Sequence, residues 1–273
     1  MPEPSPLPLF AASSDPGPSF SELLRRVSPH QLPGGVVPGT TGAIDVPHGT
    51  TVVAIRYAGG VVMAGDRRAT AGYTIASRRI EKVFAADDYS GVAIAGAAGP
   101  AIEMVKLFQT QLEHYEKVQG EALTLEGKAN QLGLLVRANL PMAMQGLAVV
   151  PLFAGFDQHR TRGRVFSYDV TGGRYEELDY QGPGSGSVHA RNWIKSGWTE
   201  GMSLDDAVLL AIRSLFAAAD EDVATGGPDL VRGIFPMVAA IDAEGFRALD
   251  DDDVAQRSRA LLDGRERGGG EQS

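Results

Sequence analysis

Residues 49–70 read GTTVVAIRYAGGVVMAGDRRAT, and no other part of the chain says as much about its fold. Two runs rich in apolar and β-branched residues, 51–58 and 60–66, are separated by Gly59. Valine and isoleucine favour strands, and a glycine between two such runs favours a turn, so the pattern predicts a β-hairpin. This hairpin begins at Thr51, directly after the pair Gly49-Thr50.

Further strand and helix patterns follow the hairpin, and the helices come in pairs. Apolar runs favour strands, whereas apolar residues at i, i+3, i+4 and i+7 favour helices that open with a proline or a capping residue. Helix pairs between strand hairpins disfavour the alternating βαβ order of a doubly wound sheet. The predicted fold class is therefore α+β, a layered sandwich of antiparallel sheets covered by helix pairs. Its further elements are strands at 78–88 and 91–99, helices from Pro100 and over 125–146, strands at 148–157 and 164–170, helices over 187–198 and from Ser203, a strand at 235–245 and a final helix after Asp253.

The composition excludes several classes of function. The chain has 273 residues, of which 43% are hydrophobic, enough for one large domain without a disulfide or a structural metal. It contains no cysteine, which excludes disulfide frameworks, cysteine-ligated metal centres and thiol nucleophiles. The net charge of −9 argues against nucleic acid as a partner. Neither a signal peptide nor an apolar run of about 18 residues is recognisable, so we expect no membrane association and a cytoplasmic location.

Residues 1–49 are predicted to form a leader outside the globular part. They hold 10 of the 16 prolines, which disfavours a continuous helix or strand there. Within this leader, Ser19 and Glu22 have the spacing of a capping box, and apolar residues follow at helical spacing. A short amphipathic helix over 19–27 and a disordered segment with a chance pattern both remain open. The predicted organisation is a leader, 1–49, a globular domain, 50–264, and a polar flexible tail, 265–273.

Most familiar catalytic and metal-binding motifs are missing from the sequence. It has neither the phosphate-binding pattern G-x-x-x-x-G-K-[ST] nor HExxH, and its five histidines lack metal-ligand spacing. His189 lies near Ser185 and Ser187, but a histidine close to serines is weak support for a catalytic triad. The sequence therefore predicts no cofactor and no metal.

The junction between leader and globular part, Val46-Pro47-His48-Gly49-Thr50-Thr51, suggests a different chemistry. If the chain is cut after Gly49, Thr50 gains a free α-amine with a pKa of about 8, compared with about 10.4 for a lysine amine. Such an amine acts as the general base for the hydroxyl of its own residue. The alternative is that Gly-Thr-Thr simply begins a strand, because threonine favours strands. Taken alone, the junction favours the simple start of a strand.

The residues that follow resemble the proteasome β-subunit family, the self-processing threonine proteases of the N-terminal-nucleophile hydrolase fold. Asp66 lies sixteen residues after Thr50 and Lys82 thirty-two residues after it, as the acid and the lysine of that family do. The earlier Gly39-Thr40-Thr41 has no acid and no lysine at these offsets, and neither has Thr51. The resemblance covers roughly 50–245 and is closest to actinobacterial members, through the strings MAGDRR (63–68), HYEK (114–117) and TGGPDLVRGIFP (225–236).

This resemblance implies a fold and a catalytic centre. The fold would be a four-layer αββα sandwich. Thr50, exposed by cleavage of the Gly49–Thr50 bond, would be the nucleophile of a threonine-type endopeptidase. Lys82 would lower the pKa of its hydroxyl, and Asp66 would hold Lys82 in place. The N–H of Gly96 would face the oxyanion.

Further residues would orient the amine and bind the substrate. Ser185 and Asp222 match the residues that orient the terminal amine. Three positions after Asp222, where many members carry serine, this chain has Thr225, which keeps a hydroxyl. The implied substrate pocket is apolar and favours apolar or aromatic residues before the cut bond. Its residues would be Ala69, Thr70, Ile80, Phe84, Ile94 and Ala98.

The resemblance also implies an assembly. Two inner rings of seven β subunits would lie between two rings of α subunits, and the leader would block Thr50 until assembly. A ring ATPase would unfold substrates, including proteins tagged with a prokaryotic ubiquitin-like protein. Three alternatives remain: a non-catalytic ring subunit, against which the complete residue set argues, the simpler bacterial double-ring relative, and an amidase of the same fold.

Overall fold

The computed structural model describes the backbone of residues 50–269 and the side chains of residues 50–264. The predicted leader, with its helix over 19–27, therefore lies outside the described residues. Within them, no helix is long and apolar enough to cross a membrane.

Two five-stranded sheets form the centre of the described part, and all their strand pairs are antiparallel. A separate two-stranded hairpin joins β3 (Ala69–Ala71) to β4 (Thr74–Ser77). The first sheet has the order β10 (Tyr180–Gln181), β1 (Val52–Tyr57), β2 (Gly60–Gly65), β11 (Met237–Asp242), β12 (Gly245–Ala248). The second has the order β5 (Val83–Asp87), β6 (Ser90–Gly96), β7 (Val149–Asp157), β8 (Arg162–Tyr168), β9 (Arg174–Glu177).

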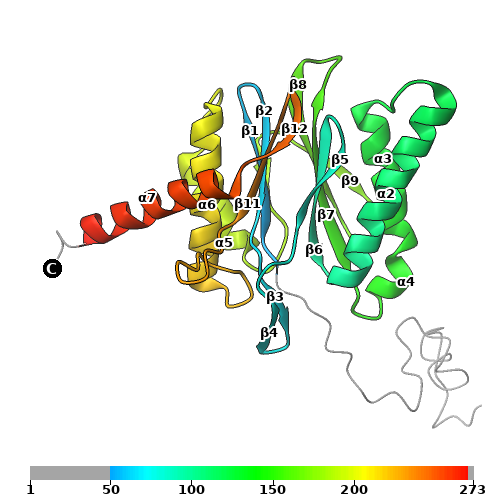
Figure 1. Cartoon of the computed structure of the whole chain (residues 1–273). Coiled ribbons are helices and arrows are strands. Elements are labelled where there is room, and N and C mark those ends of the chain that lie inside the picture. The colour runs from blue at the N-terminus through cyan, green and yellow to red at the C-terminus, as the bar shows by residue number, and fades with distance from the viewer. Residues whose placement is uncertain (1–49, 270–273) are drawn as a thin grey trace, which may run out of the picture. The chain divides into compact units, whose positions relative to one another are not determined.

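Helices cover the outer faces of both sheets (Figure 1). On the second sheet lie α2 (Ala98–Gln119), α3 (Leu125–Ala138) and the short α4 (Leu140–Ala143). On the first sheet lie α5 (Ser187–Gly197) and α6 (Leu204–Glu221), followed by α7 (Asp251–Gly269). The order of layers is helices, sheet, sheet, helices, so the predicted α+β sandwich, with four αββα layers, is confirmed.

The central strands are apolar on both faces because each face meets another layer. In β1, Val52 and Ala54 face the second sheet, whereas Val53 and Ile55 pack under the helices of the first sheet. Successive side chains of a strand point to opposite faces, so a strand buried on both sides reads as one continuous apolar run. This explains why VVAI in residues 52–55 contains no polar residue.

Several predicted boundaries differ from the structure. The single helix expected over 125–146 is wrong in length, since α3 ends at Ala138 and Pro141 belongs to the separate α4. Proline has no N–H to continue the hydrogen-bond ladder of a helix, which explains the break. The strand expected at 78–88 is shorter in the structure, where β5 covers only Val83–Asp87. The strand expected at 235–245 is also shorter, since β11 covers only Met237–Asp242. α7 continues to Gly269, so the backbone of 265–269 is helical where a flexible tail was predicted.

Candidate active site

Thr50 lies at the entry to β1, where the first sheet meets the loop before α5. It is 8% exposed, and its carbonyl oxygen accepts a hydrogen bond from Ser185 N–H at 3.0 Å. Gly184 lies opposite Thr51 with a φ of +118°, a conformation that residues with a Cβ rarely adopt. A Cβ at Gly184 would lie 1.9 Å from the Thr50 carbonyl oxygen. Glycine at this position therefore allows the two backbones to approach and brings Ser185 to Thr50.

Asp66 and Lys82 form a fully buried ion pair. Asp66 follows β2 directly and is 0% exposed, whereas Lys82 precedes β5 and is 2% exposed. Lys82 Nζ lies 2.6 Å from Asp66 Oδ1 and 2.5 Å from the Arg68 carbonyl oxygen. Asp66 also accepts the backbone N–H groups of Thr51, Arg68 and Gly226 at 2.9, 2.8 and 2.8 Å. Burial lowers the pKa of Lys82, while the Asp66 carboxylate opposes that shift.

Thr50 and Lys82 line one small pocket together with Gly96 and four of the six predicted substrate-binding residues. The pocket has a volume of about 250 Å³, including its open mouth. Gly96 ends β6 with a φ of +106°, and a Cβ there would lie 2.1 Å from the Ala148 carbonyl oxygen, so glycine fits this position. The complete lining is Thr50, Ala69, Ile80, Lys82, Ile94, Ala95, Gly96, Ala98 and Ala101.

Thr70 and Phe84 are not among the residues that line this pocket. Phe84 lies in β5 opposite Val92 of β6, and it packs against the hydrophobic cluster under α2 and α3. Thr70 lies in β3, opposite Ile75 of β4. Ala95 and Ala101, which line the pocket, were not predicted, because an alanine in an apolar run gives no local sign that it faces a cavity.

Ser185 and Asp222 form a second polar pair, on the side of Thr50 that faces α5 and α6. Asp222 caps the end of α6, and its Oδ2 accepts the hydroxyls of Ser185 at 2.5 Å and of Thr225 at 2.6 Å. Its Oδ1 accepts the Ala224 N–H at 3.1 Å. Burial acts to raise the pKa of Asp222, but these hydrogen bonds outweigh it and the pKa is lowered. The carboxylate is therefore ionised near neutral pH.

Thr51 also belongs to this group of polar contacts, although its position in the sequence suggested only an alternative nucleophile. Its hydroxyl lies 2.6 Å from that of Thr225, and Gly186 N–H donates to it at 3.0 Å. The only signal in the sequence was a second hydroxyl directly after Thr50.

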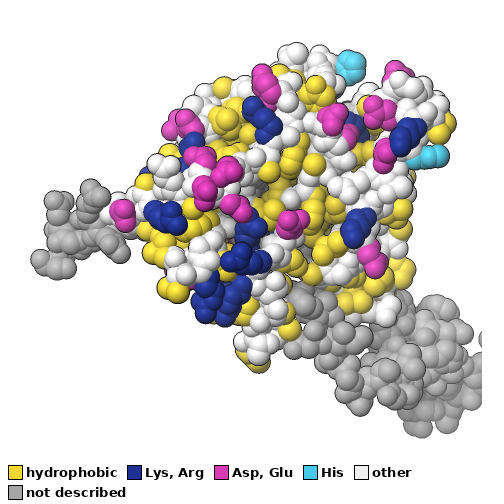
Figure 2. All heavy atoms as spheres, viewed as in Figure 1, with side chains coloured by type: hydrophobic (Ala, Val, Ile, Leu, Met, Phe, Trp, Pro, Cys, Tyr) yellow, Lys and Arg dark blue, Asp and Glu magenta, His cyan; other side chains and the backbone are white. Residues whose placement is uncertain are grey.

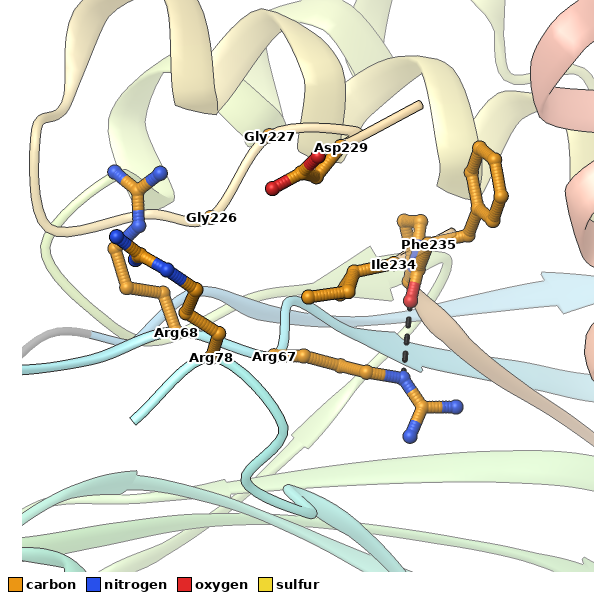
Figure 3. Close-up of a pocket in the computed structure, with 9 residues that line it drawn as sticks. Arg67, Arg68, Arg78, Gly226, Gly227, Asp229, Ile234 and Phe235 are labelled. Carbon is orange, nitrogen blue, oxygen red and sulfur yellow. Dashed lines mark hydrogen bonds between the residues drawn. The ribbon is translucent and has the colours of Figure 1, made fainter. Parts of the chain in front are cut away.

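A second pocket is lined by three arginines, Arg67, Arg68 and Arg78, and by residues of the segment 226–236 (Figure 3). Arg67 Nε–H donates to the Phe235 carbonyl oxygen at 3.0 Å (Figure 3). Arg68 Nη1 donates to the Val223 carbonyl oxygen at 2.8 Å. These bonds tie the segment 66–68, whose Arg68 carbonyl contacts Lys82, to the segment after α6. Lys and Arg side chains gather on this face beside β3 and β4 (Figure 2). Among the described residues, no group of histidine and acidic side chains is arranged to hold a metal ion.

Comparison with known proteins identifies the family. The sequence model of the proteasome subunit family matches residues 46–231, a range that includes every predicted catalytic residue. The chain belongs to the proteasome subunit family. It is 60% identical over 245 residues to the "Proteasome subunit beta" of Acidimicrobium ferrooxidans, covering 90% of this chain and 89% of that protein. It is 56% identical over 259 residues to the "Proteasome subunit beta" of Streptomyces griseus, covering 94% and 92%. The family resemblance drawn from the sequence is thus confirmed.

Proposed function

We propose that this chain is a catalytic β subunit of a 20S proteasome core and acts as a threonine-type endopeptidase with Thr50 as nucleophile. The observation that carries this proposal is the buried pair of Asp66 and Lys82, because Lys82 lines the same pocket as Thr50. A non-catalytic subunit has little use for such a pair, since apolar side chains of similar volume stabilise a fold at least as well. Family membership and the names of the relatives agree with the proposal.

The proposed reaction begins when cleavage after Gly49 frees the α-amine of Thr50. With an ordinary pKa of about 8, this amine is partly neutral near pH 7 and accepts the proton of the Thr50 hydroxyl, directly or through a water. Oγ forms a bond to the substrate carbonyl carbon, and the tetrahedral intermediate then expels the leaving amine, which takes the proton. The remaining Thr50 ester is hydrolysed by water, which restores the hydroxyl and releases the carboxylic acid product.

The proposed roles of the other residues follow from their charges. The Lys82 ammonium favours the ionised form of Oγ and, by like-charge repulsion, the neutral form of the amine. Asp66 keeps Lys82 charged against the burial that lowers its pKa. Gly96 N–H donates to the oxyanion, a contribution of about 3–4 kcal/mol in other acyl-transfer enzymes. Ser185 and Asp222 orient the amine.

The apolar pocket predicts a preference for apolar residues before the cut bond. Its lining supplies no carboxylate to pair with a bound lysine. Its one cation, Lys82, is already paired with Asp66, and the other walls are apolar, so a bound glutamate is also disfavoured. In a series of fluorogenic peptides that differ only at this residue, we expect kcat/KM for leucine or phenylalanine to exceed that for lysine or glutamate at least about tenfold. Equal rates across the series would show that this pocket does not hold that residue.

The proposed partners are α subunits and further copies of this chain, in inner β rings of seven between two α rings. The leader 1–49 would keep Thr50 blocked until these rings assemble. A ring ATPase and substrates tagged with a prokaryotic ubiquitin-like protein are proposed on the family resemblance alone.

The test of this function is the intact mass and N-terminal sequence of the chain after co-expression with its α partner. We expect a new N-terminus at Thr50 and covalent labelling of Thr50 by a peptide epoxyketone or boronate. An uncut, unlabelled chain in a fully assembled particle would instead indicate a structural ring subunit. A cut elsewhere would mean that another residue is the nucleophile.

A further inference from the structure

Thr51, the residue after the proposed nucleophile, connects the two carboxylates of the site. Its backbone N–H donates to Asp66 Oδ1 at 2.9 Å, the same oxygen that Lys82 Nζ contacts. Its hydroxyl lies 2.6 Å from that of Thr225, which donates to Asp222 Oδ2 at 2.6 Å. One buried threonine thus reaches one carboxylate directly and the other through a single hydroxyl.

The hydrogen-bond donors determine the direction of every proton in this chain of contacts. Each threonine hydroxyl carries one proton. Thr225 donates its proton to Asp222, so it can only accept from Thr51. Thr51 therefore donates to Thr225 and accepts the N–H of Gly186, at 3.0 Å. The order runs from Gly186 through Thr51 and Thr225 to Asp222, with no alternative arrangement of the hydroxyl protons.

The chain of contacts is shielded from solvent and closely fitted. Thr51 and Thr225 are both 0% exposed. A Cβ on Gly186 would lie 2.7 Å from both hydroxyl oxygens, so glycine allows its N–H to come this close. Hydrogen bonds in such surroundings are stronger than at a surface, and a group that loses its partner there is costly.

We propose that Thr51 is a positioning residue whose backbone and hydroxyl together hold the Asp66 and Asp222 carboxylates in one geometry around Thr50. This inference rests on the proposed function, in which Asp66 orients Lys82 and Asp222 orients the amine. Without the Thr51 hydroxyl, the Thr225 hydroxyl oxygen no longer receives a hydrogen bond from Thr51, and the Gly186 N–H loses the acceptor that it has in the wild type. The amine then loses its alignment, whereas the substrate pocket, which Thr51 does not line, is unchanged.

Thr51→Val and Thr51→Ser test the hydroxyl separately from the methyl group. Valine replaces the hydroxyl by a methyl group of similar size, and serine keeps the hydroxyl alone. The full chains are assembled with the α partner, and kcat and KM for an apolar peptide are expressed per mole of N-terminal Thr50 counted by mass spectrometry. We expect valine to lower kcat about tenfold with KM changed less than about twofold, and serine to restore kcat to within about threefold of wild type.

Two further variants sharpen the test. Thr225→Val interrupts the same chain of contacts one step later, so the Thr51→Val/Thr225→Val double variant should be no slower than the slower single variant. Ser214→Ala is the matched control, because it removes a buried hydroxyl that bonds only to the Ala211 carbonyl oxygen within α6. Its kcat should equal that of wild type.

The inference is overturned by an unchanged kcat in Thr51→Val, by a loss that serine does not restore, or by additive losses in the double variant. If Thr51→Val does not assemble, Thr225→Val and Thr225→Ser must show the same loss of kcat and the same rescue, or the inference fails. A wild-type chain whose Thr50 is not labelled contradicts the proposed function itself. A labelled, active wild type with unaffected variants contradicts only the role of Thr51.

Discussion

Thr50→Ala is expected to abolish both cleavage after Gly49 and peptide hydrolysis by the assembled particle. Alanine removes the oxygen that forms the ester, and the lining of the pocket offers no other hydroxyl or thiol to replace it. Removing the nucleophile of a comparable hydrolase costs at least about 10⁴-fold in kcat. The measurement is the chain's intact mass in the assembled particle, together with its rate on an apolar fluorogenic peptide.

Thr50→Ser provides the matched comparison for this variant. Serine keeps the hydroxyl and, once the chain is cut, the α-amine, so cleavage and measurable hydrolysis should both persist. Thr50 is 8% exposed, and its backbone carbonyl accepts a hydrogen bond from Ser185 N–H. A serine keeps this backbone contact, so the loss of one methyl group should leave the fold intact. A Thr50→Ala particle that hydrolyses peptides at a rate near that of wild type would rule out Thr50 as the nucleophile.

Lys82→Met is expected to produce the second largest loss. Methionine fills a similar volume but leaves the Asp66 carboxylate buried at 0% exposure without its cation. Breaking a buried pair by removing one partner costs about 3–5 kcal/mol of the free energy of unfolding. Because the ammonium also lowers the pKa of the Thr50 hydroxyl in the proposed mechanism, we expect kcat to fall at least about 10³-fold. Thermal unfolding and peptide hydrolysis measure the two effects.

Lys117→Met is the control for a lysine that loses an ion pair on the surface. Lys117 pairs with Glu113 along α2, but its side chain is 73% exposed, so solvent screens the pair. The melting temperature and the kcat of the Lys117→Met variant should both stay at the wild-type values. If Lys82→Met were as harmless as Lys117→Met, the buried pair would be neither catalytic nor structural.

Much of the fold was predictable because apolar runs and helix-capping residues are strong local signals of strands and helices. The apolar runs around Gly59 predicted the hairpin of β1 and β2, which the structure contains. Ser203 and Asp206 predicted the start of α6, and the Ser203 hydroxyl accepts the Asp206 N–H at 3.1 Å. The strands β3, β4, β9, β10 and β12 were not predicted, because short strands form where a partner strand lies beside them rather than where their own composition demands it.

The sequence by itself determined the fold class, the family and the spacing of Thr50, Asp66 and Lys82, because strand runs, helix periods and fixed offsets along the chain are local properties. Only the tertiary structure brought Thr51 to Gly186 and to Thr225, which lie 135 and 174 residues further along the chain. It also left Phe84 out of the pocket lining, although Phe84 packs against the same hydrophobic cluster as Ile94, which does line the pocket. A hydrogen bond between distant residues, or the choice of which residues in one apolar cluster border a cavity, depends on how whole layers pack. Neither leaves a periodic signal in the residues that take part.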